Sequence, residues 1–130
     1  MPGLMTKNIF ARDGAGKRHF LIVVPFNKRI DLAQLAHALS STKLGMASPE
    51  RLMKHLGIVP GSVSLLALIN DSEGAVEAVI DQAVWDAPAV QAHPLRNTAT
   101  VSMRHETLER FLEYTGHFPR VLEVPGQLAS

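Results

Sequence analysis

The chain has 130 residues, of which 46% are hydrophobic, 19% are charged and none is cysteine. About 100–150 residues is typical of one domain, and such a domain can bury a core without a disulfide or a metal. The lack of cysteine excludes a disulfide framework, a thiolate metal site and a cysteine nucleophile. Since no apolar run reaches the roughly 18 residues of a membrane span and no signal peptide opens the chain, we expect a cytoplasmic protein without a membrane partner.

The net charge of +1 conceals an uneven distribution. Residues 1–54 carry nine Lys or Arg and three Asp or Glu, whereas residues 55–130 carry four basic and nine acidic residues. A basic surface is typical of nucleic-acid binding, but the halves of a sequence need not be faces of a fold, and lysines also keep proteins soluble. Charge alone leaves a nucleic-acid-binding protein and an ordinary soluble domain open.

The first half of the chain predicts a hairpin and two helices. Two apolar segments around a glycine-rich turn predict a β-hairpin over residues 6–25, because glycine supplies the positive φ of a tight turn. Asp31 can cap a helix with inward-facing apolar residues at helical spacing (Leu32, Leu35, Ala36 and Leu39). Ser48, followed by proline, predicts a second helix that ends at Gly57 and directs three residues inward (Leu52, Met53 and Leu56).

The rest of the chain is richer in strands. Strands are predicted at residues 43–47, 63–69, 75–81, 89–92, 97–103 and 118–124. A third helix is predicted over residues 105–115, with Gly116 as its C-terminal stop and three residues inward (Leu108, Phe111 and Leu112). Because strands outnumber helices and the connections are mixed, we expect an α+β fold with a mixed β-sheet and about three helices.

Local motifs add little chemistry by themselves. The segment Gly14–Lys17 lacks the further glycine and the Ser or Thr of a phosphate loop, and the six histidines lack metal-ligand spacing, so we expect no metal. By pattern alone, His93 before Pro94 is typical of a histidine that caps a turn, and Lys7 of a solvated lysine at a strand end. The residue patterns therefore predict a soluble α+β domain that could bind anions.

Several short segments are more specific together than alone. They are Lys7-Asn8-Ile9-Phe10, Pro60-Gly61-Ser62-Val63-Ser64, Leu68-Ile69-Asn70-Asp71, His93-Pro94-Leu95 with Asn97-Thr98-Ala99-Thr100, and Thr115-Gly116-His117. In this order, from about residue 3 to residue 124, the chain resembles the YbaK/ProX prolyl-tRNA editing family, and within it the free-standing alanyl-tRNA(Pro) deacylase branch.

The resemblance implies a trans-editing hydrolase that deacylates mischarged tRNA(Pro), above all alanyl-tRNA(Pro), by positioning water at the aminoacyl ester without a cofactor. Its expected partners are the acceptor end of that tRNA and, as a second candidate, prolyl-tRNA synthetase. The family pattern implies that Lys7 is the catalytic lysine and that Asn8 lies beside it in the pocket. It also implies that His93 lies at the pocket's edge and that backbone groups of one turn hold the ester (Gly61, Ser62, Val63, Ser64 and Leu65).

Two departures from the family pattern qualify the expected activity. Leu65 stands where the family has proline, and Ala67 where it has glycine, so the pocket can differ in shape and the amino acid that is cleared stays open. The match begins almost at Met1, whereas the family has a helical segment ahead of its Lys-Asn pair. We expect a single YbaK-like editing domain over residues 1–130 that lacks this segment, either as a trimmed or wrongly started chain or as a short variant. The alternatives are a non-catalytic aminoacyl-tRNA or nucleotide-binding module that kept the fold without turnover, and a regulatory or structural partner protein.

Overall fold

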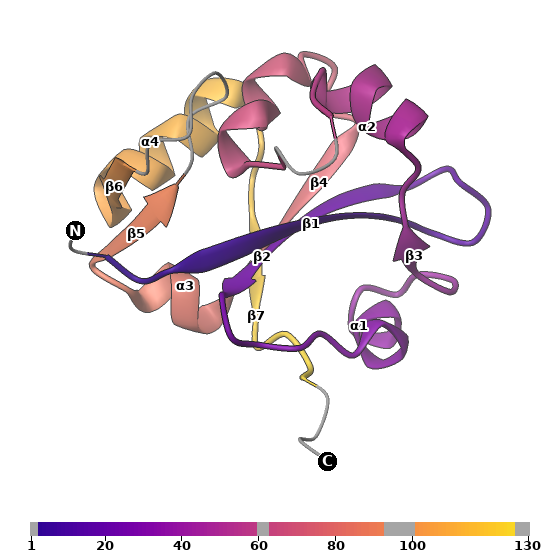
Figure 1. Cartoon of the computed structure of the whole chain (residues 1–130), viewed down its shortest axis with the longest axis horizontal. Helices are drawn as coiled ribbons and strands as arrows, with labels where there is room; N and C mark the ends of the chain where they lie inside the picture. The colour runs from indigo at the N-terminus through magenta and orange to yellow at the C-terminus, as the bar shows by residue number, and fades with distance from the viewer. Residues whose placement is uncertain (1–2, 60–62, 93–100, 127–130) are drawn as a thin grey trace.

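A mixed sheet forms the centre of the molecule. The computed structural model describes residues 3–59, 63–92 and 101–126. Its five-stranded sheet has the order β3-β1-β2-β4-β7 and combines antiparallel with parallel pairs (Figure 1). These strands are β1 (Thr6–Arg12), β2 (His19–Pro25), β3 (Gly45–Met46), β4 (Val76–Asp81) and β7 (Arg120–Leu122). A second, antiparallel pair comprises β5 (Ala89–Ala92) and β6 (Val101–Arg104). The α+β class and the mixed sheet are confirmed.

The predicted hairpin is confirmed, since β1 and β2 pair antiparallel over their full length. Asp13 stabilises the turn between them: its Oδ1 accepts hydrogen bonds from the N–H groups of Arg18 (3.0 Å) and Lys17 (2.8 Å). These bonds, chiefly that from Arg18, hold the pKa of the Asp13 carboxyl below its ordinary value. Gly16 in the same turn has a φ of 72°, which glycine adopts without strain.

The predicted helices form at their predicted caps. The described residues form four α-helices and one 3₁₀ helix, namely α1 (Leu32–Ala38), α2 (Pro49–Leu56), η1 (Leu65–Asn70, 3₁₀), α3 (Gln82–Asp86) and α4 (His105–Thr115). Asp31 and Ser48 cap α1 and α2 with their side chains, while Gly57 and Gly116 end α2 and α4 in the left-handed conformation. Met53, predicted to face inward, is instead 50% exposed, because it lies off the stripe of buried residues on α2.

Two expectations for the middle of the chain are wrong. The segment predicted as a strand over 63–69 forms η1, because the Oγ of Ser64 accepts a hydrogen bond from Leu66 N (3.2 Å) and begins a helical turn. Short apolar runs do not distinguish a buried strand from a buried helix. Helix α3 was not predicted, although the side chain of Asp81 caps it at Ala83 N (3.2 Å). The described residues therefore hold more helices than the expected three.

Three strands are shorter than predicted or only partly described. Strand β3 covers two residues of the predicted 43–47, and β7 covers three of the predicted 118–124. Strand β6 lies at the end of the predicted 97–103, and residues 97–100 lie outside the described residues. The strands at 75–81 and 89–92 are confirmed with nearly the predicted bounds.

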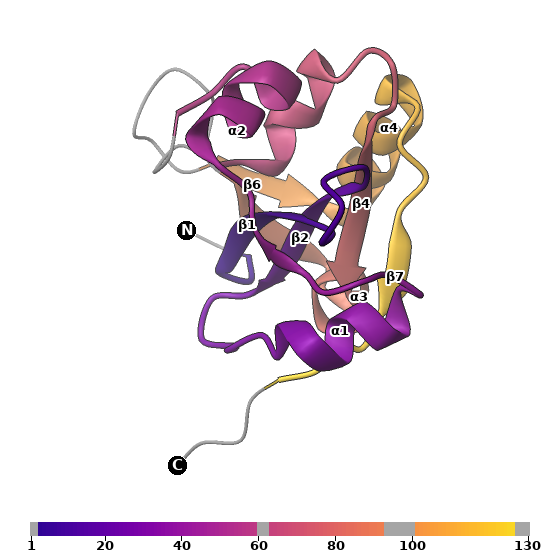
Figure 2. The ribbon, with the colours of Figure 1, turned by 90° about the vertical axis from the view of Figure 1, so that its right-hand side faces the viewer.

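The sheet separates two hydrophobic clusters. Helix α1 packs on one face against Phe20, Ile22 and Val24 of β2, whereas α2, η1 and α4 pack on the other against Leu21 and Val23 (Figure 2). Because β2 is covered on both faces, its residues from His19 to Val24 are buried. We call the two sides the α1 face and the α2 face of the sheet.

Candidate functional site

The two predicted residues on β1 point toward opposite faces of the sheet. Successive side chains of a strand alternate, so Asn8 lies on the α2 face with Phe10, and Lys7 lies on the α1 face with Ile9, which packs against the α1-face cluster. Their common location is the outer edge of β1, because β3 pairs only with Ala11 and Arg12 further along. The two side chains therefore leave β1 in opposite directions, and a ligand that meets both of them would lie at this edge.

Asn8 carries a buried polar atom that lacks a partner. Its Oδ1 is buried and has no hydrogen-bond partner within the described parts of the chain. Leaving such an acceptor unpaired costs roughly 1–3 kcal/mol, so a donor that pairs with it would stabilise the bound state. An N–H or O–H donor of a bound molecule would satisfy this oxygen.

The start of η1 lies on the same side of the sheet as Asn8. Val63 and Leu65 pack in the α2-face cluster that also contains Phe10, and Leu65 is 4% exposed. Ser64 is buried as the cap of η1. The remaining predicted site residues (Gly61, Ser62 and His93) lie outside the described residues. The structure thus brings Asn8 and residues 63–65 to one face and Lys7 to the other.

The backbone at position 65 can accept the proline that the family pattern has there, so the variant Leu65→Pro should fold. Leu65 is the first residue of η1, where proline is accepted, and the extended backbone of Ser64 suits a residue before proline. Loss of part of the buried side chain should lower the free energy of unfolding by about 1–3 kcal/mol, measured in urea. In the matched variant Leu66→Pro, the bond from Leu66 N to Ser64 is lost and Leu65 is helical before a proline, so the loss should be larger. Equal losses would show that η1 does not begin as described.

Two motifs of the resemblance have structural roles. The Nδ2 of Asn70 donates to the Leu56 carbonyl at the end of α2 (2.8 Å). The carboxylate of Asp71 lies 2.8 Å from the Nε2 of His117, and both residues are buried. These side chains join η1, α2 and the end of α4, so the contacts they make within the fold account for the two motifs.

Sequence reasoning missed a basic cavity at the other end of the hairpin. This cavity of about 490 Å³ is lined by residues of the hairpin turn, including Lys17 and His19, and of α2, including Arg51, Lys54 and His55. The excess of basic residues before position 55 was the signal, but only the fold brings these residues together. His37 is exposed on α1, and His55, in the last turn of α2, lines the cavity and is partly buried.

Neither a metal cluster nor a membrane span emerges from the part of the chain that the structure describes. No three His, Asp or Glu side chains there are grouped so that they could hold a metal ion. None of the described helices is long and apolar enough to cross a membrane.

Comparisons with known proteins identify related chains over most of this sequence. The model of the aminoacyl-tRNA editing domain family matches residues 2–111. The prolyl-tRNA editing protein ProX of Acetoanaerobium sticklandii is 37% identical over 120 residues, which are 92% of this chain and 73% of the relative. The prolyl-tRNA synthetase associated domain-containing protein 1 of Danio rerio is 34% identical over 124 residues, covering 94% of this chain and 67% of the relative.

Solved structures support the same fold. One structure, described as that of a candidate trans-editing enzyme for prolyl tRNA synthetase, superimposes with a TM-score of 0.69 at 20% identity. The match covers 96% of this chain and 72% of that one. At this identity the likeness concerns the fold, and it agrees with the mixed sheet and flanking helices described above.

Proposed function

Because the chain belongs to the aminoacyl-tRNA editing domain family, we propose that it is a trans-editing hydrolase that removes alanine from mischarged tRNA(Pro). The observation that carries the proposal is the family match over residues 2–111, which includes β1 and its Lys7-Asn8 pair. The acceptor end of the tRNA is the proposed substrate. Prolyl-tRNA synthetase, which appears in the name of the Danio rerio relative, is a proposed second partner.

An aminoacyl ester needs little help to hydrolyse. The ester is already activated, so an oriented water and stabilisation of the developing oxyanion are sufficient. In our proposal Lys7 supplies the positive charge, paired with the terminal phosphate or the ester oxygen. The N–H groups of the turn from Gly61 to Leu65 face the oxyanion, and the vicinal hydroxyl of the tRNA helps to position the water. No general base from the protein is then required.

Asn8 gives this scheme a further anchor. The buried Oδ1 of Asn8 can accept a hydrogen bond from the substrate's ammonium group or ribose hydroxyl, which would remove the cost of the unpaired atom. Lys7 and Asn8 approach the substrate from the two faces of the sheet, and therefore the ester is proposed to bind at the outer edge of β1. His93 is proposed to lie at the edge of the same pocket.

The test is the deacylation of tRNA(Pro) charged with alanine, cysteine or proline. We expect the alanyl species to be cleared at least about tenfold faster than the prolyl species, because a pocket sized for alanine rejects the larger ring sterically. Clearance of none of the three, with tRNA binding intact, would contradict the enzyme and support the non-catalytic module instead. Fast clearance of the cysteinyl species alone would contradict the alanyl preference. The change in preference would then be attributed to the pocket around Leu65.

A further inference from the structure

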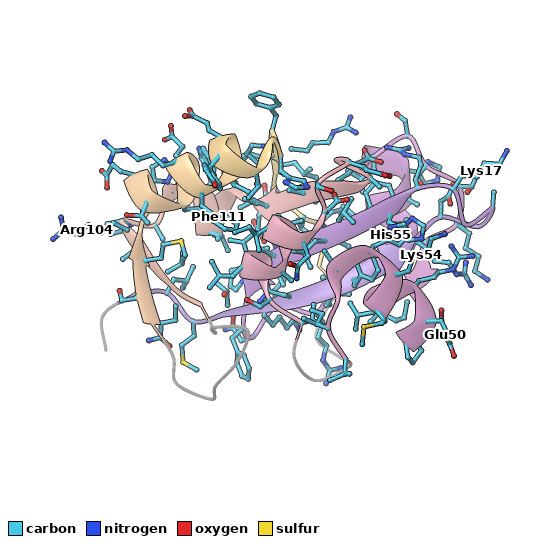
Figure 3. The ribbon with its side chains drawn as sticks, turned by 90° about the horizontal axis from the view of Figure 1, so that it is seen from above. Lys17, Glu50, Lys54, His55, Arg104 and Phe111 are labelled. Atoms are coloured by element: carbon cyan, nitrogen blue, oxygen red, sulfur yellow. The ribbon has the colours of Figure 1, made fainter. Side chains whose placement is uncertain are left out.

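The cavity between the hairpin turn and α2 has a strongly basic lining. Lys17, Lys54 and His55 lie together at one end of the molecule, and Arg104 lies at the opposite end (Figure 3). Lys17 and Lys54 are exposed at the cavity's rim, whereas His19 is 4% exposed at its inner wall. Exposed lysines around a half-open hollow suit an anionic group that belongs to a larger molecule.

Arg51 is held in place before any ligand binds. Its Nη1 donates to the Gly16 carbonyl (3.0 Å) and lies 3.0 Å from the Nε2 of His19. A Cβ added at Gly16 would lie 2.6 Å from Nη2, so the guanidinium rests directly on the glycine of the turn. The Nε and Nη2 donors have no acceptor among the described residues. A fixed guanidinium with two free donors is the arrangement that binds a phosphate in bidentate fashion.

Two histidines close the inner wall of the cavity. The ring centroids of His19 and His55 are 4.1 Å apart, and Phe10 stacks on the other side of His19 at 5.7 Å. Burial, then the neighbouring His55 and the Arg51 guanidinium, lower the pKa of the His19 imidazole. A neutral His19 can accept the hydrogen bond from Arg51. An anion in the cavity would reverse the charge effect and favour protonation.

The positive charge of the cavity is not balanced by its neighbours. In the described ranges, the ion pairs involve Arg18, Lys28, His105 and His117, and none involves Lys17, Arg51 or Lys54. Three acidic groups are near: Glu50 in the lining, Glu73 in the adjoining hollow beside Lys54, and Asp13. The carboxylate of Asp13 is engaged by the N–H groups of the turn. The cavity therefore keeps an excess of positive charge.

We propose that this cavity binds a phosphate group, and that the phosphate belongs to the backbone of the tRNA acceptor strand. The assignment of this phosphate to tRNA rests on the proposed function. His19 pairs with Arg12, five residues along β1 from Lys7, which places the cavity about 17 Å from that lysine. If the aminoacyl end of the tRNA acceptor strand binds at Lys7, a backbone phosphate a few nucleotides from that end would therefore reach the cavity.

The binding of uncharged tRNA(Pro) tests the site without requiring hydrolysis. The dissociation constant is measured between about 50 and about 200 mM salt for the wild type, Lys17→Ala, Lys54→Ala and the matched control Arg104→Ala. Each cavity variant should weaken binding and reduce the slope of log affinity against log salt by up to about 1, whereas Arg104→Ala should leave the slope unchanged. If both lysine variants keep the wild-type salt slope, or if Arg104→Ala reduces the slope equally, the bound phosphate does not belong to the tRNA backbone.

Inorganic phosphate and adenosine monophosphate provide a second, independent readout. With the full chain, NMR titration of the imidazoles should show that either compound raises the pKa of His19, and that Lys54→Ala reduces this effect. A response to these compounds with unchanged tRNA slopes would reassign the cavity to a small phosphorylated molecule. No response to the compounds and unchanged slopes would overturn the phosphate site altogether. If the chain deacylates charged tRNA but the lysine variants leave the salt slope unchanged, only this inference is overturned. If the lysine variants reduce the salt slope but the chain deacylates none of the charged tRNAs, only the proposed function is contradicted.

Discussion

Lys7→Ala should reduce the deacylation of alanyl-tRNA(Pro) by about 10²–10³-fold, the loss typical of one removed oxyanion-stabilising donor. The same change should alter the free energy of unfolding by less than about 0.5 kcal/mol, as surface substitutions commonly do. Lys7 is partly exposed, and its side chain makes no hydrogen bond or ion pair with the residues that the structure describes. Its pairing with Val24 in the hairpin involves the backbone, which alanine keeps. The rate is measured in single turnover, and the stability by urea denaturation.

Lys43→Ala provides the matched control, because Lys43 is an exposed lysine outside the edge of β1 and outside the basic cavity. It should leave both the rate and the stability near the wild-type values. The conservative variant Lys7→Arg keeps the charge but changes its position, so it should recover only part of the rate. A loss of rate in Lys7→Ala that is matched by a loss of stability would show that the lysine acts on the fold and would remove its proposed catalytic role.

The features of the fold that could be predicted are those that local chemistry determines. Asp31, Ser48, Gly57 and Gly116 mark helix ends because each satisfies or permits a backbone arrangement within a few residues. Features set by distant contacts could not be predicted. The parallel pairing of β2 with β4 joins segments more than fifty residues apart, and no local pattern announces it. The cap at Asp81 was a usable signal for α3, which the short length of that helix concealed.

The residues of the candidate site could likewise be predicted only in part. Lys7 and Asn8 were identified through resemblance, because a lysine and an amide before a strand have no specific chemistry by pattern. Their opposite orientations follow from strand alternation and could have been derived from the predicted hairpin. The basic cavity could not, since it combines a hairpin turn with a helix more than thirty residues later. Likewise, nothing in the sequence pairs Asp71 with His117, which are 46 residues apart.

The buried carboxylate of Asp71 contacts several parts of the fold. Its Oδ1 accepts from Ala75 N (3.0 Å), and its Oδ2 accepts from Val76 N (2.8 Å) at the start of β4. The same Oδ2 lies 2.8 Å from the Nε2 of His117, just beyond α4. His117 is itself held in place. Its Nδ1 lies 2.8 Å from the Thr115 hydroxyl, and its backbone N–H donates to the Leu112 carbonyl of α4. One carboxylate therefore joins η1, β4 and α4.

Asp71→Ala should lower the free energy of unfolding by about 3–5 kcal/mol, because it leaves two backbone N–H groups and a buried imidazole without their acceptor. The melting temperature should fall by about 10–20 °C. Asp86→Ala, at an exposed aspartate on α3, should cost less than about 0.5 kcal/mol. If Asp71→Ala does not fold, Asp71→Asn keeps one acceptor and should show an intermediate loss. In a double-mutant cycle with His117→Asn, the two changes should couple by more than about 0.5 kcal/mol, since the residues share a bond. Additive losses would mean that Asp71 stabilises the start of β4 alone and that α4 is held by its apolar contacts.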